Sequence, residues 1–387
     1  METDSDYMRL ALRLALRGYG ATSPNPMVGA VLVRAGRVIG RGWHRRAGGP
    51  HAEIEALEDA RRRHQRLEGA ALYVTLEPCS THGRTPPCTE AIIQRRLSRV
   101  VAGATDPNPR HAGRGFALLR QAGLTVVHGL LAGPCERLNR AFNHWIVRRA
   151  PFVTVKAAMT LDGKIATASG QSKWITGKRA RHYGMKLRQG ADAILVGINT
   201  ILADDPSLTV RLGRNQGSKA GSHRLRRLVL DSMARTPLGA RVVSDDPAAL
   251  TTIVVGESAP KKRVAALAAR VNVLVAPPAR AAHGSARGGT HRLDLHWLVK
   301  KLGADNVTSL LVEGGGEVNA AFLLEGLAQR IAFFYAPKIL GGGGSRPAVG
   351  GIGALAMDRT IDLSQVQWRR LGPDWLLTAQ VEEAGLL

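Results

Sequence analysis

The sequence GAALYVTLEPCSTHGRTPPCTEAIIQRRLSRVVAGAT, residues 69–105, decides the fold of the first half of the chain. It begins with a run of apolar and β-branched residues over 69–77, which is typical of a buried strand. A loop of Gly, Pro and hydroxyl residues follows and carries Cys79 and Cys88, with eight residues between them. The residues after Cys88 predict a helix and then, at 99–105, a second buried strand. Strand, helix and strand in this order indicate an α/β domain.

The same alternation extends to both sides of this segment. Residues 29–43, GAVLVRAGRVIGRGW, predict a hairpin of two strands that turns at Ala35–Gly36. HAEIEALEDARRR, 51–63, predicts a helix that begins after Gly-Gly-Pro. Further on, 115–123 predict a helix and 124–131 a strand. Helices that connect the strands of one sheet cover both of its faces, so the N-terminal domain is predicted to have three layers, α/β/α.

A second α/β unit is predicted to start near Phe152, where FVTVKAAMT opens a new strand after a helical connection. Apolar runs separated by helical stretches follow it: ADAILVG, RRLVLDS, LTTIVVG, VNVLVAP, VTSLLVEGG and RIAFFYAPKIL. A chain of 387 residues exceeds the size, roughly 250–300 residues, at which a single core stops growing. Length therefore favours two domains over three, and we expect the two to be residues 1–146 and 147–387.

The first twenty residues predict an amphipathic helix and neither a signal peptide nor a membrane span. They open acidic, and Arg9, Arg13 and Arg17 interrupt every apolar run. No stretch of about 18 apolar residues occurs in the sequence. We therefore expect a cytoplasmic protein, in which thiols stay reduced and a structural disulfide is not expected. The two cysteines of the loop are then either idle buried thiols or ligands of one metal, and Cys135 is expected to be a packed thiol.

The charge of the chain is strongly positive. Its 54 Lys and Arg against 30 Asp and Glu give a formal net charge of +24. Such an excess attracts nucleic acids and anionic metabolites. However, arginine is spread along the whole sequence, and no stretch interleaves basic with aromatic residues. We therefore interpret the charge as solvated faces and expect a small-molecule substrate rather than a nucleic acid.

Four residues around the cysteine loop suggest a catalytic zinc site. His51 and Glu53 open one predicted helix, Cys79 follows a strand, and Cys88 opens the next helix. A catalytic zinc needs three protein ligands and an open position, and zinc deaminases carry H-x-E and P-C-x-x-C, with the Glu as a proton carrier. Here H-x-E and P-C are present, but the second cysteine comes after eight residues instead of two. Either half of the pattern alone is weak, but together they predict zinc bound by His51, Cys79 and Cys88, with Glu53 as the general acid and base.

The segments TSPNPMVGAVLV, PHAEIEAL, LEPCSTHGRTPPC and DPNPRHAGRG resemble the deaminase half of the RibD family of bifunctional riboflavin biosynthesis proteins. The resemblance implies a cytidine-deaminase-like fold. The gap of eight residues between the cysteines is usual in that family and separates it from the tRNA adenosine deaminases. The family usually has His directly after Cys-Ser, whereas this chain has Thr81 there and His82 one position later.

The resemblance also implies that Asn25, His44 and Arg84 contact the pyrimidine or its ribose phosphate. Each residue has a structural alternative. Asn25 suits a turn, His44 ends the predicted hairpin, and Arg84 could be an exposed loop residue.

In the second half, LLVEGGGEVNAAF (310–322) is the clearest local signal. A strand is predicted to end at Glu313, three glycines follow, and a helix starts near Val318. Such a turn allows backbone N–H groups at a helix N-terminus to approach a phosphate, although it is as often only a tight connection. The dinucleotide fingerprint Gly-x-Gly-x-x-Gly is absent, because Asn319 stands at its third glycine.

Together with KAAMTLDGKIATASGQSKWITG, ADAILVGINTILADDPSLTVR and RRLVLDS, this turn makes the second half resemble the reductase domain of the same family. The resemblance implies a dihydrofolate-reductase-like α/β fold and NADPH as cofactor. It implies cofactor contacts at Ala158, Trp174, Thr200, Asp204, Ser232, Gly315, Gly316, Glu317, Val318 and Asn319. It implies contacts with the substrate's sugar phosphate at Lys156, Ser172, Arg188, Leu208, Arg211 and Glu313. Two of these, Trp174 and Leu208, could equally be core residues.

The expected protein is therefore a bifunctional enzyme, a zinc-dependent deaminase joined to an NADPH-dependent reductase, and we expect a homo-oligomer. The first reaction would deaminate 2,5-diamino-6-ribosylamino-4(3H)-pyrimidinone 5′-phosphate, and the second would reduce its ribosyl group to ribityl. The alternative is a nucleic-acid deaminase with an appended basic module, which predicts strongly salt-dependent RNA binding.

Overall fold

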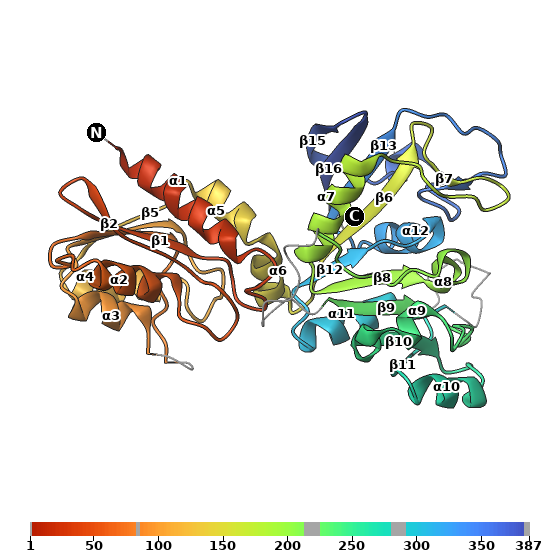
Figure 1. Cartoon of the computed structure of the whole chain (residues 1–387), viewed down its shortest axis with the longest axis horizontal. Coiled ribbons are helices and arrows are strands. Elements are labelled where there is room, and N and C mark those ends of the chain that lie inside the picture. Colours follow the sequence, from red (N-terminus) through yellow and green to blue (C-terminus); the bar gives the residue numbers. More distant parts are fainter. Residues whose placement is uncertain (1, 83–85, 213–224, 280–291, 383–387) are drawn as a thin grey trace. The chain divides into compact units, whose positions relative to one another are not determined.

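The computed structural model describes residues 2–82, 86–212, 225–279 and 292–382 of the chain. Contacts divide it into two compact units, one ending at Arg149 and the other starting at Ala150 (Figure 1). The predicted boundary between residues 146 and 147 falls within the last helix of the first unit, α6 (Arg140–Arg148).

The first unit is built on a five-stranded sheet in the order β2-β1-β3-β4-β5. The predicted hairpin is present, and its second strand lies at the edge of the sheet. Strand β1 is antiparallel to both of its neighbours, β2 and β3, whereas β3, β4 and β5 are parallel to one another. The strands are β1 (Gly29–Arg34), β2 (Arg37–Trp43), β3 (Ala71–Leu76), β4 (Arg99–Ala104) and β5 (Thr125–His128).

Helices cover both faces of this sheet (Figure 1). One face packs on Met8 and Ala11 of α1 (Asp4–Ala15) and on Cys135 of α5 (Ala132–Leu138). The other face packs on α2 (Ala52–Arg62), α3 (Cys88–Gln94) and α4 (Arg114–Gln121), through side chains such as Ala56, Ile92 and Phe116. A short 3₁₀ turn, η1 (Leu16–Gly18), follows α1. The predicted α/β/α layering is confirmed.

Two helices approach this sheet through glycines. A Cβ on Gly29 would lie 2.0 Å from the Ala11 carbonyl oxygen of α1. A Cβ on Gly42 would lie 2.2 Å from the Ala52 carbonyl oxygen of α2. Both contacts are with backbone atoms, which cannot rotate away, so only glycine allows these helices to lie so close to the strands.

The second unit is built on a nine-stranded sheet in the order β11-β10-β9-β8-β12-β6-β13-β16-β15. The strands from β11 to β13 are parallel, and the last two are antiparallel. The strands are β6 (Phe152–Thr160), β8 (Ala193–Gly197), β9 (Arg226–Leu230), β10 (Thr251–Gly256), β11 (Asn272–Ala276), β12 (Ser309–Val312), β13 (Arg330–Ala336), β15 (Leu363–Leu371) and β16 (Asp374–Val381). A separate pair joins β7 (Lys164–Ala166) to β14 (Arg346–Pro347).

Helices cover both faces of the second sheet as well. On one face, α11 (Leu295–Ala304) and α12 (Gly316–Leu324) pack on the strands. On the other face lie α8 (Ile198–Asp204), α9 (Arg241–Ser244) and α10 (Lys261–Ala268). Helix α7 (Lys178–Gln189) packs over β13 and β16. Two 3₁₀ turns, η2 (Asp246–Leu250) and η3 (Met357–Arg359), complete the described elements.

The C-terminal hairpin of β15 and β16 is an element that the apolar runs of the sequence did not predict. It adds two antiparallel strands beside β13. Asp374, at the start of β16, is buried, and its carboxylate accepts the N–H of Gly177, the residue before α7, at 2.7 Å. The hairpin therefore holds the N-terminus of α7.

None of the helices in the described part of the chain is both long and apolar enough to cross a membrane.

Candidate functional sites

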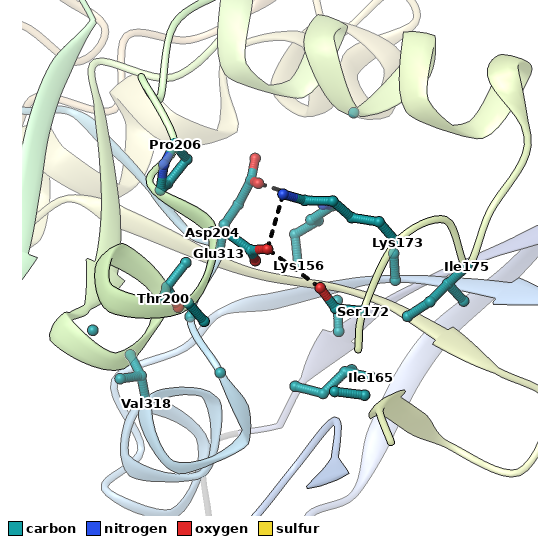
Figure 2. Close-up of a pocket in the computed structure, with 18 of the residues that line it drawn as sticks. Lys156, Ile165, Ser172, Lys173, Ile175, Thr200, Asp204, Pro206, Glu313 and Val318 are labelled. Atoms are coloured by element: carbon teal, nitrogen blue, oxygen red, sulfur yellow. Dashed lines mark hydrogen bonds and ion pairs between the residues drawn. The ribbon is translucent and has the colours of Figure 1, made fainter. Parts of the chain in front are cut away.

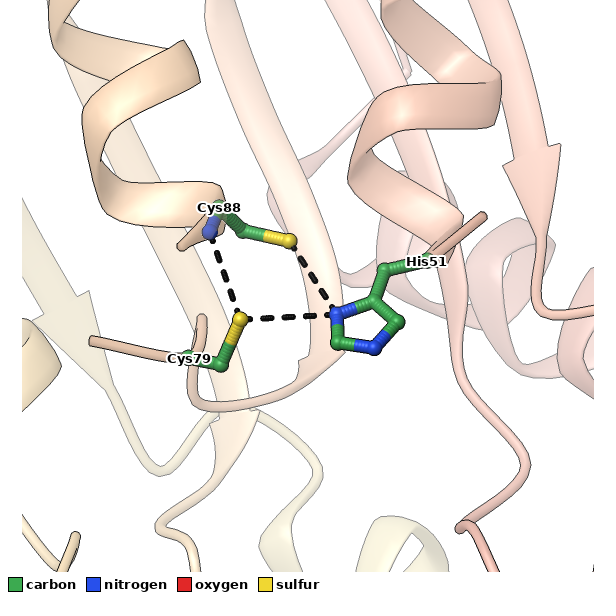
Figure 3. A group of neighbouring side chains, drawn as sticks. All are labelled: His51, Cys79 and Cys88. Atoms are coloured by element: carbon green, nitrogen blue, oxygen red, sulfur yellow. Dashed lines mark hydrogen bonds between the residues drawn. The ribbon is translucent and has the colours of Figure 1, made fainter. Parts of the chain in front are cut away.

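Three ligand-type side chains meet at one end of the first sheet. His51 precedes the first residue of α2, Cys79 follows β3, and Cys88 is the first residue of α3. Figure 3 shows the imidazole and the two thiols pointing toward one another from these three segments. Their ligand atoms all lie within 4.8 Å of one another, which is close enough to hold one metal ion. No other cluster of His, Cys, Asp and Glu among the described residues has this geometry.

The distances in this group fit a tetrahedral zinc ion. His51 Nδ1 lies 3.4 Å from Cys79 Sγ and 3.3 Å from Cys88 Sγ. With Zn–S near 2.3 Å and Zn–N near 2.0–2.1 Å, tetrahedral geometry places sulfur and nitrogen ligands about 3.5 Å apart. Two thiols and one imidazole leave a fourth position open, which is the donor set of a catalytic zinc site. The residues therefore fit the metal.

Hydrogen bonds in the group favour a thiolate at Cys79. The Cys88 backbone N–H donates to Cys79 Sγ at 3.2 Å. Hydrogen bonds from Cys88 and His51 hold the pKa of Cys79 well below its ordinary value, although burial opposes this. Zinc binds the thiolate form of cysteine. The site is therefore prepared to receive a cation.

Glu53 lies in the first turn of α2, two residues after His51, and its side chain is buried. Burial, reinforced by the charge of Cys79, raises the pKa of its carboxyl to about 7. A carboxyl group with a pKa near neutrality can both accept and donate a proton under ordinary conditions.

Two of the three expected pyrimidine contacts lie beside this group. The rings of His44 and His51 are in edge-to-face contact, with centroids 5.6 Å apart. His44 Nδ1 donates to the Pro50 carbonyl at 2.9 Å, and its Nε2 lies 3.2 Å from the Asn25 side-chain nitrogen. Burial lowers the pKa of His44, so the ring is neutral and its Nε2 accepts the Asn25 amide proton.

The remaining residues of interest in the cysteine loop, Thr81, His82 and Arg84, are exposed or lie outside the described structure. Arg84 lies outside the described residues. Thr81, at the position where the family usually has His, is exposed. His82 Nε2 lies 3.0 Å from a carboxylate oxygen of Glu90. The His82 ring is therefore within hydrogen-bond distance of Glu90, an exposed residue of α3.

The second unit contains a cavity of about 1020 Å³ toward the carboxyl ends of its central parallel strands (Figure 2). Ligands of open α/β sheets bind at this edge. Most of the expected reductase residues line it: Lys156, Ala158, Ser172, Trp174, Arg188, Thr200, Asp204, Arg211, Glu313, Gly315, Gly316, Glu317 and Val318.

A buried ion cluster forms one wall of the cavity. Arg188 donates two hydrogen bonds of 2.9 Å to the carboxylate of Glu313, and Lys156 Nζ lies 3.4 Å from it. Burial alone would favour the neutral acid, but the charges of Arg188 and Lys156 outweigh it and lower the pKa of Glu313 to about 2. Arg188 also donates to the Thr209 carbonyl at 3.0 Å, which ties α7 to the loop after α8.

A second polar cluster faces it. Asp204 accepts a hydrogen bond from the Ser172 hydroxyl at 3.3 Å and forms an ion pair with Lys173 at 3.1 Å (Figure 2). Beside this cluster, Trp174 is 66% exposed, and the Arg181 guanidinium lies 4.5 Å from the centre of its ring. The indole thus presents a flat surface in the lining of the cavity.

The glycine turn lies at the N-terminus of α12 and lines the cavity. A Cβ on Gly316 would lie 2.4 Å from the Pro347 carbonyl oxygen, whereas a Cβ on Gly315 would meet nothing within 4 Å. Gly316 is therefore needed for close packing, and Gly315 leaves space on the cavity side. This arrangement fits a phosphate that approaches backbone N–H groups at a helix N-terminus.

Three expected contact residues do not line the cavity: Leu208, Ser232 and Asn319. Leu208 is buried in the core on the side of α8 and α9. Asn319 is completely buried, and its side chain donates to the Ala348 carbonyl at 2.7 Å. Asn319 therefore holds the loop after β14 against α12.

Sequence reasoning missed Lys173, Arg181 and Arg346, which also line the cavity. Arg181 could have been found, because it lies seven residues before Arg188 in a helix, on the same face two turns earlier. Lys173 stands between two predicted contacts. Arg346 follows a run of glycines and has no periodic signal.

Both halves of the chain match known families. Residues 1–104 match the cytidine and deoxycytidylate deaminase zinc-binding region. Residues 151–377 match the RibD C-terminal domain. The second match favours a reductase over the alternative of an appended basic binding module.

Relatives cover nearly the whole chain. The chain is 41% identical to riboflavin biosynthesis protein RibD of Actinobacillus pleuropneumoniae, over 97% of this chain and 94% of that protein. It is 38% identical to RibD of Escherichia coli (strain K12), over 96% of this chain and 97% of that protein.

Among solved structures, RibD of Acinetobacter baumannii matches with a TM-score of 0.83 and 32% identity, covering 98% of this chain and 99% of that one. A Thermotoga maritima diaminohydroxyphosphoribosylaminopyrimidine deaminase/5-amino-6-(5-phosphoribosylamino)uracil reductase matches with a TM-score of 0.79 and 33% identity, with the same coverage. These matches confirm the predicted fold class, a cytidine-deaminase-like domain followed by a dihydrofolate-reductase-like domain. The chain therefore belongs to the RibD family, bifunctional enzymes of riboflavin biosynthesis that join a zinc-binding deaminase domain to a reductase domain.

Proposed function

We propose that the first unit hydrolytically deaminates 2,5-diamino-6-ribosylamino-4(3H)-pyrimidinone 5′-phosphate. The second unit then reduces the ribosyl group of the product with NADPH, giving 5-amino-6-(5-phosphoribitylamino)uracil. The proposal is supported most directly by the convergence of His51, Cys79 and Cys88 at sulfur–nitrogen distances of 3.3–3.4 Å beside the buried Glu53.

In the deaminase site, His51 Nδ1 and the sulfurs of Cys79 and Cys88 would hold zinc. When bound, the ion acts as a Lewis acid that lowers the pKa of water toward 7. Glu53 takes one proton from the attacking water and delivers it to the ring nitrogen, and it then carries the remaining proton of the added hydroxyl group to the amino group, which leaves as ammonia. The C–N bond to the amino group breaks and a C=O bond forms at the same carbon. Asn25 and His44 orient the pyrimidine.

In the reductase site, the turn Gly315–Val318 and the side chains of Trp174, Thr200 and Asp204 would hold NADPH, which supplies the hydride when bound. Lys156, Ser172 and Arg211 bind the sugar phosphate. Arg188 and Glu313 orient Lys156. The hydride adds at C1′ of the ribose, the C1′–O bond to the ring oxygen breaks, and a proton completes the new hydroxyl group.

We also infer a cytoplasmic homo-oligomer. Zinc ligation by thiolates favours a compartment in which cysteines stay reduced. Large apolar side chains are exposed on the second unit, at Ile352, Leu355, Met357 and Trp368, and a partner subunit would cover them. Light scattering coupled to gel filtration tests this: a monomer at micromolar concentration would contradict it.

The deaminase proposal is tested with Glu53→Gln and, as a matched control on the same helix, Glu58→Gln, which removes a carboxylate paired with Arg61. Metal analysis should find one zinc per chain in wild type and in both variants. Ammonia release should fall by about 10²-fold or more in Glu53→Gln and stay at the wild-type rate in Glu58→Gln. Full ammonia release by Glu53→Gln, or a wild-type protein without zinc, contradicts the proposal.

The reductase proposal is tested in the same Glu53→Gln protein supplied with the deaminated substrate. NADPH oxidation, followed by absorbance, should then proceed at the wild-type rate, because the reductase residues belong to the other unit. No oxidation by the wild-type protein would refute the second activity alone.

A further inference from the structure

Glu77 is a buried carboxylate that the proposed chemistry does not use. It follows β3, two residues before Cys79, and is 6% exposed. Its backbone N–H donates to the Ala104 carbonyl at 2.9 Å, which extends the pairing of β3 with β4. Its side chain therefore starts from a fixed position next to the metal-binding loop.

The Glu77 carboxylate accepts three backbone N–H groups. Oε2 accepts from Asp106 at 3.1 Å and from Gly113 at 3.0 Å, and Oε1 accepts from Gly115 at 2.9 Å. Gly113 and Gly115 belong to the N-terminus of α4, where N–H groups lack helical partners and a negative charge is favoured. The Glu77 side chain thus connects three segments: the loop after β4, the N-terminus of α4 and its own segment, which continues through Pro78 to Cys79.

Packing continues this connection to the ligand itself. A Cβ on Gly115 would lie 2.3 Å from the Pro78 carbonyl oxygen, so α4 rests on the peptide group immediately before Cys79. On its other side, Cys79 is held by α3. Its carbonyl accepts the Thr89 N–H at 3.2 Å, and its sulfur accepts the Cys88 N–H at 3.2 Å. Cys79 is therefore fixed between two helix N-termini.

We propose that Glu77 is a positioning residue of the zinc site: by holding α4 against Pro78, it directs the Cys79 sulfur toward the position that His51 and Cys88 share. This inference rests on the zinc site proposed above. Groups that orient a ligand typically change metal affinity about 10–100-fold when they are removed.

The test uses the full chain with Glu77→Gln. Glutamine keeps the size of the side chain but replaces one acceptor oxygen by an NH₂ group, which then faces a backbone N–H donor. The matched control is Glu90→Gln, which removes an exposed carboxylate two residues after Cys88 that contacts only His82 among the described interactions. Both variants lose one negative charge near the site, but only the first loses the connection to Cys79.

Two measurements are made on folded protein, identified by circular dichroism. Zinc affinity, from competition with a chromogenic chelator, should fall about 10–100-fold in Glu77→Gln and stay at the wild-type value in Glu90→Gln. In cobalt-substituted protein, the sulfur-to-cobalt charge-transfer bands should shift in Glu77→Gln only, because the Cys79–metal geometry changes. A purely structural role would lower the melting temperature and leave the affinity and the bands of the folded protein unchanged.

Gly115→Ala is the second variant, and it decides the question if Glu77→Gln does not fold. Its methyl group would lie 2.3 Å from the Pro78 carbonyl oxygen and 3.2 Å from Glu77 Oε1, so it displaces Pro78 while every carboxylate keeps its charge. The same loss of affinity and the same band shift are therefore expected. Wild-type affinity and spectrum in the folded variants overturn the inference. If the wild-type protein itself binds no zinc, the proposed deaminase site fails instead, and the two failures are distinguished.

Discussion

Among single residues, Glu313 carries the clearest electrostatic consequence. Its pKa in the folded protein is about 2, against an ordinary value of 4.5. The unfolded chain therefore binds a proton at higher pH than the folded chain, and stability rises with pH between these values. The ion cluster should stabilise the second unit fully above about pH 4.5, and this contribution should be lost as the pH falls through 2.

This can be measured by denaturant unfolding of the second unit as a function of pH. In wild type, the free energy of unfolding should drop by on the order of 3 kcal/mol from pH 5 to pH 2 because of this carboxyl group. Glu313→Gln should be less stable at pH 7 by about 3–5 kcal/mol, because Arg188 and Lys156 lose their buried counter-charge. It should lack that part of the acid dependence, and an unchanged acid profile in the variant would contradict the assignment.

At this scale, chemical type and spacing predicted which side chains would lie close together. His51, Cys79 and Cys88 follow strands and open helices at one edge of a sheet, so their convergence could be anticipated. Asn319 was expected at a cofactor, yet its side chain points into the protein and holds the Ala348 carbonyl. Which way a residue in a helix's first turn faces depends on the loop packed beside it, and no local pattern contains that information.

Among the elements, α2 carries Glu53 and directly follows His51, and its distance from the sheet is set by Gly42. A Cβ at Gly42 would lie 2.2 Å from the Ala52 carbonyl oxygen and 2.3 Å from the Ala56 nitrogen. Gly42→Ala should therefore push α2 outward, destabilise the first unit by about 1–3 kcal/mol or more, and weaken zinc binding. Chemical denaturation and chelator competition measure the two effects.

The control for this change is Gly239→Ala, where a Cβ would meet no atom within 4 Å. It should leave stability and zinc binding near their wild-type values. If Gly42→Ala bound zinc as tightly as wild type, α2 would not need its close contact with β2 to place the ligand.

The elements themselves were largely predictable, because buried parallel strands read as continuous apolar runs and their helices show a 3.6-residue period. The hairpin of β15 and β16 was not predicted, because its first strand is not a buried apolar run. Much of β15 is exposed, with Trp368 57% exposed, so its residues form no apolar run. A search for alternation around the Gly372–Pro373 turn would have been the appropriate signal.

At the scale of the whole molecule, the buried clusters of the two units share no residue in the part of the chain that the structure describes. We therefore expect two calorimetric unfolding transitions. Removal of zinc by a chelator should lower the first unit's transition and leave the other in place, because a ligand stabilises only the unit that binds it. NADPH at a hundred times its dissociation constant should raise the second unit's stability by about 2.7 kcal/mol.

A single transition that both zinc and NADPH move would contradict the independence of the two cores. Length favoured two units without excluding a third, and it gave no division after Arg149, because α6 continues through the predicted boundary. A domain border depends on which core a helix packs against, and composition does not record that.

The burial of Cys135 has a practical consequence. This thiol is 1% exposed, and its sulfur lies so close to β4 that a Cβ on Gly103 would come within 2.2 Å of it. Burial raises its pKa to about 12, so it does not ionise near neutrality. A chromogenic disulfide reagent added to native protein should therefore not react with Cys135, and the colour it develops should come from Cys79 and Cys88 alone. Protein with bound zinc should stay colourless, whereas protein without zinc should develop colour, with Cys79 reacting first. The fraction of sites that hold zinc can then be measured by absorbance, without metal analysis.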